Sequence, residues 1–125
     1  MARILIIDDD PDTRNFLEQT LSSAGYQAFT AAEGREGLKQ FLRDPVDLVV
    51  TDIFMPEQDG LEIIAGLRTR FPELPIIAIT GHTPDLLSVA QKMGATETLH
   101  KPFSPGELLA TVLKVLPKAD GRACA

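Results

Sequence analysis

An uninterrupted apolar run from Ile4 to Ile7 is followed at once by three consecutive aspartates, Asp8 to Asp10. An unbroken run of isoleucine and leucine that ends in a polar cluster is typical of a strand buried on both faces. Strands of this kind occur in parallel sheets that are covered by helices on each side. The feature therefore predicts an α/β fold in which acidic side chains follow directly on a buried strand.

A helix is expected directly after the aspartates. Asp10 suits the N-cap and Pro11 the first helical position, and Gly25 is expected to end the helix in a left-handed conformation. The last helix of the chain has an equally clear start, because Ser104 and Glu107 have the spacing of a capping box.

The alternation of strand and helix continues along the chain. Segments with strand character also cover residues 27–31, 47–52, 75–80 and 97–100, the last with poor strand propensity. Periodicity, caps and breakers predict helices over residues 11–24, 35–43, 61–70, 83–93 and 104–116. Five alternations predict a doubly wound parallel sheet with helices on both faces, and a ligand site beyond the carboxyl ends of the strands. Met93, Met55 and the apolar helix residues are assigned to the core.

A chain of 125 residues has the size of one domain. We assign residues 1–117 to this domain and residues 118–125 to a short flexible tail. Eighteen acidic against twelve basic residues give a net charge of −6. This balance argues against direct binding to nucleic acid, whose phosphates would be repelled, and is compatible with binding a cation.

The sequence also indicates a location. No apolar run approaches the roughly 20 residues of a membrane span, and the first residues lack the layout of a signal peptide. The single cysteine, Cys124, has no partner within the chain. These observations predict a cytoplasmic protein without membrane association.

Polar side chains follow four of the five predicted strands. Asp8 and Asp9 follow the first strand, Asp52 ends the third, Thr80 ends the fourth and Lys101 follows the fifth. Each has an ordinary explanation when taken alone, such as a helix cap, a strand leaving the core or a solvated lysine. Three carboxylates at one point, however, repel one another strongly unless they are protonated or bound to a metal.

Oxygen ligands favour Mg²⁺, with Mn²⁺ as the alternative, over Zn²⁺. A metal-bound carboxylate beside a hydroxyl and an ammonium is a fitting receptor for a phosphoryl group, because the cations neutralise charge and the hydroxyl donates a hydrogen bond. The set of residues therefore indicates phosphoryl chemistry.

Four motifs together resemble the receiver domain of two-component response regulators, the family that includes the chemotaxis regulators. The resemblance runs in order from about Arg3 to Leu116. It implies a flavodoxin-like sheet of five parallel strands in the order 2-1-3-4-5 with five flanking helices. The motifs are Ile4–Asp10, Val49–Pro56 with Asp59-Gly60, Ile79–Gly81 and Lys101–Phe103.

The resemblance implies a role for each residue of the acidic set. Asp52 resembles the acceptor that takes a phosphoryl group from a phosphohistidine donor, either a sensor histidine kinase or a histidine phosphotransfer protein. Asp9 resembles the direct Mg²⁺ ligand and Asp8 the acid that acts largely through water. The backbone carbonyl of Phe54 would supply a further ligand.

Thr80 resembles the switch hydroxyl that follows the phosphoryl group, and Lys101 the amine that pairs with it. The Lys101–Pro102 peptide is cis in the family. Phosphorylation is expected to switch binding of a downstream protein through the face formed by the fourth helix, fifth strand and fifth helix. The chain would be a monomer or a phosphorylation-dependent dimer, and it would promote its own phosphorylation and dephosphorylation without being an enzyme.

Three positions are expected to modulate this behaviour. Thr98 stands three residues before Lys101, where the family commonly has Tyr or Phe as a rotameric switch, and threonine has no ring to swing. Phe54 and His82 stand two residues after Asp52 and Thr80, at positions that affect the lifetime of the acyl phosphate. Each has an ordinary alternative, which is partial burial for Phe54 and a solvated loop position for His82.

Several functions are open at this stage. The chain is interpreted first as a stand-alone regulator without a DNA-binding output. The alternatives within the family are a phosphorelay intermediate, which Thr98 slightly favours, and an N-terminal fragment of a longer response regulator or hybrid kinase. A Mg²⁺-dependent phosphatase with an aspartyl-phosphate intermediate is disfavoured because Phe54 stands where such enzymes carry a second acid. A flavodoxin-like mononucleotide binder lacks the phosphate loop after the first strand.

Overall fold

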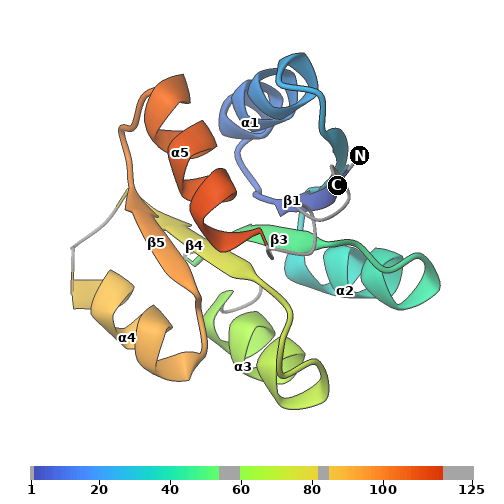
Figure 1. The fold of residues 1–125 in the computed structure, drawn as a ribbon. Coiled ribbons are helices and arrows are strands. Elements are labelled where there is room, and N and C mark those ends of the chain that lie inside the picture. Colours follow the sequence, from blue (N-terminus) through green and yellow to red (C-terminus); the bar gives the residue numbers. More distant parts are fainter. Residues whose placement is uncertain (1, 54–59, 82–84, 117–125) are drawn as a thin grey trace.

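The computed structural model describes residues 2–53, 60–81 and 85–116, in which parallel strands alternate with helices (Figure 1). The predicted elements are confirmed to within one residue at their ends, except that the predicted start of the fourth helix, 83–84, lies outside the described residues. The strands are β1 (Arg3–Ile7), β2 (Gln27–Ala31), β3 (Leu48–Asp52), β4 (Ile76–Thr80) and β5 (Glu97–His100). The helices are α1 (Pro11–Ser23), α2 (Gly34–Arg43), α3 (Gly60–Arg70), α4 (Asp85–Met93) and α5 (Pro105–Val115).

The strands form one parallel sheet in the order β2-β1-β3-β4-β5. The doubly wound fold and the strand order implied by the family resemblance are therefore confirmed. In register, Ile7 at the end of β1 lies opposite Ala31 of β2 and Thr51 of β3, and Asp52 lies opposite Ile79 of β4. Since all strands run in one direction, their carboxyl ends meet at a single edge of the sheet.

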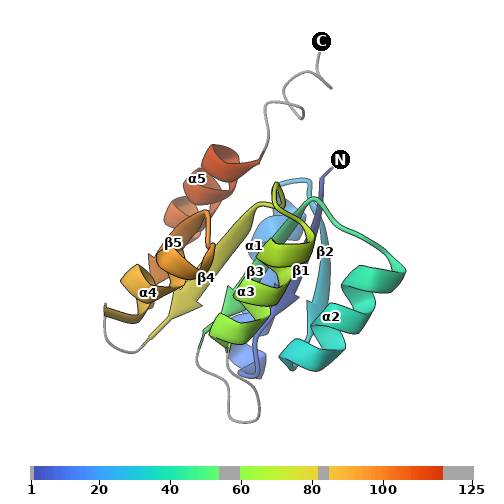
Figure 2. The same cartoon turned by 90° about the horizontal axis from the view of Figure 1, so that it is seen from below.

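Helices cover both faces of the sheet. Figure 1 shows α1 and α5 on one face, and Figure 2 shows α2, α3 and α4 over the other. Along β1, Ile4 and Ile6 pack in the layer of α1 and α5, whereas Leu5 and Ile7 pack in the layer of α2, α3 and α4. The unbroken apolar run is explained by this arrangement, because both faces of the strand are buried.

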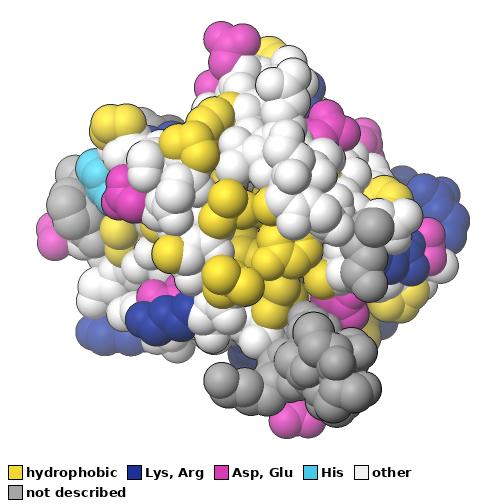
Figure 3. Space-filling model, turned by 45° about the horizontal axis from the view of Figure 1, so that its top comes forward, with side chains coloured by type: hydrophobic (Ala, Val, Ile, Leu, Met, Phe, Trp, Pro, Cys, Tyr) yellow, Lys and Arg dark blue, Asp and Glu magenta, His cyan; other side chains and the backbone are white. Residues whose placement is uncertain are grey.

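The side of α1 and α5 is seen in Figure 3, where hydrophobic side chains gather in the middle of the face. Leu113 of α5 is 70% exposed. A groove runs between α1 and α5, and it is lined by Gln19, Thr20, Ser23, Ala24, Pro105 and Leu109. The layer of α1 and α5 thus packs apolar side chains against the sheet, while a groove stays open between the two helices.

The predicted helix ends are confirmed by their hydrogen bonds and backbone angles. The Asp10 carboxylate caps α1 by accepting from the amide of Asp12, and Ser104 and Glu107 form both bonds of a capping box at α5. Gly25, after α1, has a φ of 96°, in the region that favours glycine. No helix in residues 2–53, 60–81 and 85–116 is long and apolar enough to cross a membrane.

The assignment of the apolar helix residues to the core is wrong for Leu42, Val89 and Leu113, which are 47%, 40% and 70% exposed, and Met55 lies outside the described residues. The assignment is also wrong for Met93. Its side chain is 37% exposed, and Ala90 is the buried residue of α4. Helix α4 packs on β4, β5 and α3 near the edge strand β5, so that neighbouring elements cover only one narrow side of it. A methionine in its last turn therefore projects past the layer it was expected to fill.

The connection after α4 is held by Arg68 of α3. The guanidinium donates to the carbonyl oxygen of Gly94 from Nε at 3.0 Å and from Nη2 at 2.8 Å, and also to carbonyls that follow α3. Gly94 has a φ of 126°. A Cβ at this position would lie 2.7 Å from Cγ of Arg68, so that both the backbone conformation and the available space require glycine.

We predict opposite effects of two Gly→Ala substitutions on the free energy of unfolding. Gly94→Ala should destabilise the protein by about 2 kcal/mol because alanine disfavours a positive φ and would displace Arg68. Gly66→Ala in α3, where an added Cβ meets nothing within 4 Å, should stabilise by about 0.5–1 kcal/mol through helix propensity. Urea denaturation of the two variants measures the difference. A Gly94→Ala variant as stable as Gly66→Ala would contradict the account of this connection.

Candidate functional site

Three carboxylates meet beyond the carboxyl ends of β1 and β3. One oxygen each of Asp8, Asp9 and Asp52 lies within 4.8 Å of the others. Asp8 is fully buried and Asp52 is 6% exposed, whereas Asp9 is exposed. The cluster therefore has two acids set into the protein and one at the surface.

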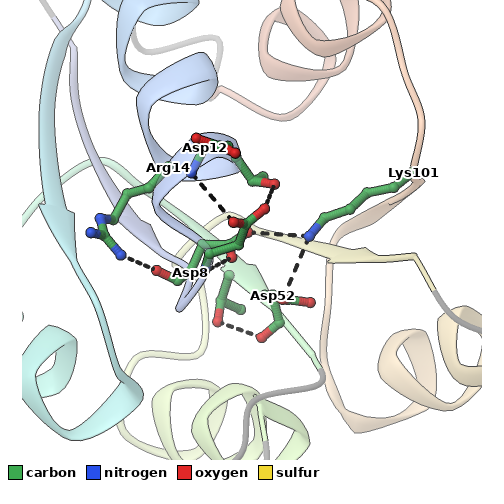
Figure 4. Close-up of polar contacts among 8 residues, drawn as sticks. Asp8, Asp12, Arg14, Asp52 and Lys101 are labelled. Carbon is green, nitrogen blue, oxygen red and sulfur yellow. Dashed lines mark hydrogen bonds and ion pairs between the residues drawn. The ribbon is translucent and has the colours of Figure 1, made fainter.

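Lys101 brings an ammonium group between the two buried acids (Figure 4). Its Nζ lies 3.4 Å from Oδ2 of Asp8 and 3.6 Å from Oδ2 of Asp52. The backbone amide of Lys101 donates to the carbonyl oxygen of Thr80 at 2.8 Å, and the Lys101–Pro102 peptide is cis. One ammonium offsets only part of the charge of three carboxylates, so that the site keeps an excess of negative charge when all are ionised.

Burial raises the pKa of Asp8 from 3.8 to about 6. The hydrogen bond from the Asp10 amide lowers this pKa, the charge of Asp52 raises it, and Lys101 lowers it. Because desolvation outweighs the favourable contacts, the ionised form of Asp8 is costly without further positive charge. This is the electrostatic condition in which a bound cation lowers the free energy of the folded state.

The turn between β1 and α1 fixes the acidic pair. The Asp10 amide donates to Oδ1 of Asp8 at 2.9 Å, and the Thr13 hydroxyl donates to Oδ2 of Asp10 at 2.6 Å. The hydrogen bond from Thr13 lowers the pKa of Asp10. Asp10 is thus occupied with capping α1, as the sequence predicted, while Asp8 and Asp9 are left for the cluster.

The strand end that carries Asp52 is tied to neighbouring elements. The Thr51 hydroxyl donates to the carbonyl oxygen of Asp52 at 3.0 Å, and the Ile53 amide donates to Ile79 of β4 at 2.9 Å. The Gly60 amide, at the start of α3, donates to the carbonyl of Ile53 at 2.8 Å. A Cβ on Gly60 would overlap the carbonyl oxygen of Asp52, so that glycine permits the close approach of α3 to this strand end.

The other residues singled out from the sequence lie near this edge or outside the described residues. Thr80 is fully buried at the end of β4, one residue beyond the partner of Asp52. Thr98 is half-buried and lies opposite Ala78. By the alternation of side chains along a strand, Thr98 lies on the sheet face covered by α2, α3 and α4. Phe54 and His82 lie outside the described residues.

Sequence reasoning did not single out Arg14, whose Nη1 donates to the carbonyl oxygen of Asp8 at 2.8 Å. A signal was present, because a cation close to the start of a helix is disfavoured by the helix dipole and calls for a local explanation. Gly60 was part of a quoted motif but was given no role. Its need for close backbone approach becomes visible only in three dimensions.

The donor set fits a magnesium ion. Asp8, Asp9 and Asp52 offer only oxygen ligands, which suit Mg²⁺ and Mn²⁺ and disfavour Zn²⁺. The raised pKa of the buried Asp8 is consistent with the same conclusion, since this carboxylate lacks enough compensating charge in the protein alone.

The family model described as the response regulator receiver domain matches residues 4–113. The chain is 40% identical over 120 residues to the response regulator MprA of Mycolicibacterium vanbaalenii, covering 92% of this chain and 50% of that protein. It is 33% identical over 119 residues to the alkaline phosphatase synthesis transcriptional regulatory protein PhoP of Bacillus subtilis, covering 94% and 50%. The chain spans about half the length of the curated relatives it matches.

Solved structures show the same fold. The chemotaxis protein CheY4 of Vibrio cholerae superposes with a TM-score of 0.87 at 36% identity, covering 93% of this chain and 99% of that one. The response regulator protein TrrA of Thermotoga maritima, solved in complex with Mg²⁺ and BeF, superposes with a TM-score of 0.85 at 36% identity, covering 93% and 100%. At these identities the likeness extends beyond the fold to the family.

We predict that Asp8→Asn stabilises the metal-free protein at pH 7 to 8. The pKa of Asp8 is about 6 when folded against 3.8 as its ordinary value. The folded state therefore binds more protons than the unfolded state between these values, and stability falls as the pH rises through them. A shift of this size corresponds to roughly 3 kcal/mol, of which we expect about 1–2 kcal/mol to be recovered because the new amide group faces Lys101.

Urea denaturation in EDTA at a series of pH values measures this effect. The advantage of Asp8→Asn should vanish below about pH 3, where Asp8 is protonated in both states of the parent. A constant difference across the pH range, or a less stable variant at pH 8, would contradict the predicted cost of the buried charge. Asp12→Asn, at an exposed acid of the same sheet edge, is the matched control and should show no such pH dependence.

Proposed function

The chain belongs to the response regulator receiver domain family, and on that premise we propose that it is a phosphorylation-controlled signalling receiver with Asp52 as the acceptor. The observation that carries the proposal is the ammonium of Lys101, 3.4 Å from Asp8 and 3.6 Å from Asp52, at a cluster that Asp9 completes. An acceptor carboxylate, a cation site and a fixed positive charge are thereby gathered at one point.

In the proposed reaction an oxygen of Asp52 attacks the phosphorus of a phosphohistidine. An O–P bond forms, the N–P bond breaks, and the donor histidine leaves as a neutral imidazole after taking up a proton. The product is an acyl phosphate on Asp52. Asp52 lies at the end of β3 and is 6% exposed, so that the strand and its surroundings hold the carboxylate in place.

Lys101 supplies fixed positive charge to the transferred group. Its ammonium, already between Asp8 and Asp52, can follow the negative charge onto the phosphoryl oxygens. The residues that would hold Mg²⁺ are Asp8, Asp9 and Asp52, with the carbonyl of Phe54 as the family resemblance implies. When bound, the ion supplies charge neutralisation for the carboxylates and the phosphoryl oxygens.

We propose that phosphorylation changes the surface of the protein through the carboxyl ends of β4 and β5. Thr80 supplies a hydroxyl at the end of β4, and its carbonyl accepts from the amide of Lys101. Among the exposed parts of α4, β5 and α5 are Val89 and Met93 of α4, which are 40% and 37% exposed, and the Lys114–Glu97 ion pair at 2.8 Å, which joins α5 to β5. This mixed apolar and charged surface suits a protein partner.

The partners we propose are a sensor histidine kinase or histidine phosphotransfer protein as the donor and a downstream protein as the target. The relatives MprA and PhoP are about twice the length of this chain, whereas the chemotaxis protein is matched over 99% of its length. We propose a receiver that acts through a protein target, with onward transfer in a relay as the alternative because Thr98 replaces the usual aromatic switch. Phe54 and His82 are proposed to affect the lifetime of the acyl phosphate.

We predict that the protein gains one phosphoryl group when it is incubated with acetyl phosphate and Mg²⁺. The gain should be lost in Asp52→Asn, because no carboxylate remains at the proposed acceptor position, and it should be lost in EDTA. Intact-mass spectrometry measures the gain. Asp12→Asn is the matched control and should still be phosphorylated. No mass gain in the parent, or an equal gain in Asp52→Asn, would overturn the proposal.

We predict that Lys101→Met has opposite effects on Mg²⁺ binding and on the rate of phosphorylation. With one positive charge fewer beside the acids, Mg²⁺ should bind about fivefold more tightly, since the lost repulsion is of the order of 1 kcal/mol. The rate of phosphorylation at saturating Mg²⁺ should fall by about 100-fold, the usual effect of removing one stabilising donor. Calorimetry and timed mass spectra measure the two quantities.

Lys114→Met removes the same charge from α5, away from the cluster, and should change neither quantity appreciably. A Lys101→Met variant that is phosphorylated at the parent rate would show that this ammonium has no part in the transfer.

A further inference from the structure

Asp9 differs from its two partners in how it is held. Asp8 and Asp52 are buried, so that the surrounding protein restricts their side chains, whereas Asp9 is exposed. Its direction therefore depends on the backbone that carries it. That backbone is the short turn between β1 and α1.

The peptide groups on both sides of Asp9 are fixed by hydrogen bonds. On the amino-terminal side, the carbonyl of Asp8 accepts from Nη1 of Arg14 at 2.8 Å. On the carboxyl-terminal side, the amide of Asp10 donates to Oδ1 of Asp8 at 2.9 Å. The first of these bonds comes from a side chain outside the turn, and Figure 4 shows Arg14 reaching the backbone of Asp8 from α1.

Arg14 is itself held in place. It is half-buried, and its amide donates to the carbonyl of Asp10 at 2.9 Å as part of the first turn of α1. The contact with Asp8 therefore joins the start of the helix to the end of the strand across the residues that carry the acids.

We propose that Arg14 is a positioning residue for the cation site, fixing the Asp8–Asp9 peptide so that the exposed carboxylate of Asp9 points into the cluster. Lys101 pairs with Asp8 and Asp52, whereas Arg14 acts on the peptide of Asp9. Removing an outer contact that orients a metal ligand commonly weakens metal affinity by about 10- to 100-fold. The inference rests on the proposed function, because it assumes that the cluster binds Mg²⁺.

The experiment titrates Mg²⁺ alone into three variants of the full chain by calorimetry. Arg14→Gln should weaken binding by roughly tenfold, the lower end of the range for outer contacts of a metal site. Arg14→Lys keeps the charge without the planar fork and should weaken binding by about threefold. Arg35→Gln removes the same charge from an exposed position early in α2, at the same sheet edge, and should stay within about twofold of the parent.

A second readout needs no metal. Hydrogen exchange of the Asp10 amide, which bonds to Asp8, should become faster in Arg14→Gln while that of the β3 amides stays the same. Thermal melting shows whether each variant is folded. If Arg14→Gln does not fold, Arg14→Lys still tests the proposal.

The outcomes separate the two proposals. Parent affinity in a folded Arg14→Gln, or an equal loss in Arg35→Gln, would overturn the positioning role and leave the receiver function standing. A variant with a lower melting temperature but unchanged affinity and Asp10 exchange would show a structural role only, and would equally overturn it. A parent that binds no Mg²⁺ would overturn both.

Discussion

Repulsion among three carboxylates at one edge of a sheet is the interaction on which the rest of this structure depends. Asp8, Asp9 and Asp52 have oxygens within 4.8 Å of one another, and a parallel sheet brings them together because β1 and β3 end at the same edge. A single ammonium, Lys101, offsets part of the charge. The incomplete balance makes the site responsive, because any added cation or phosphoryl group changes the interactions of all four groups at once.

A site with unbalanced charge needs a scaffold that does not yield to it. The sheet supplies this scaffold because β3 and β4 are buried along their whole length and β1 nearly so. The strand ends are then held individually. The backbone amide of Asp8 donates a hydrogen bond to the carbonyl of Ala31. The end of β3 at Asp52 is held by the hydrogen bond from the Ile53 amide to Ile79 and by the close approach of Gly60. The cost of placing the acids together is therefore met by packing elsewhere, as is common where function opposes local stability.

The sequence was informative where one residue determines its own surroundings. The run Ile4–Ile7 predicts a strand buried on both faces, and Asp10 and Ser104 predict caps that the structure contains. The order of the strands came from the family resemblance, because alternation and handedness alone allow several orders. Met93 and Arg14 were misjudged or missed, since exposure on α4 and a contact from α1 to Asp8 depend on elements that meet only in the folded chain.

Under the proposed function, Thr98 bears on how a change at the acid cluster could reach the surface of the protein. It lies opposite Ala78 on the sheet face covered by α2, α3 and α4, without a ring that could move between inner and outer positions. One link between the two regions runs through the backbone: the carbonyl of Thr80 accepts from the amide of Lys101, and Thr80 lies opposite His100 in the β4–β5 register. A movement of Lys101 toward a phosphoryl group would therefore act on the end of β5 directly. Under the proposed function, a shift of this strand end would be passed to α4, because β5 is the edge strand and α4 packs against it.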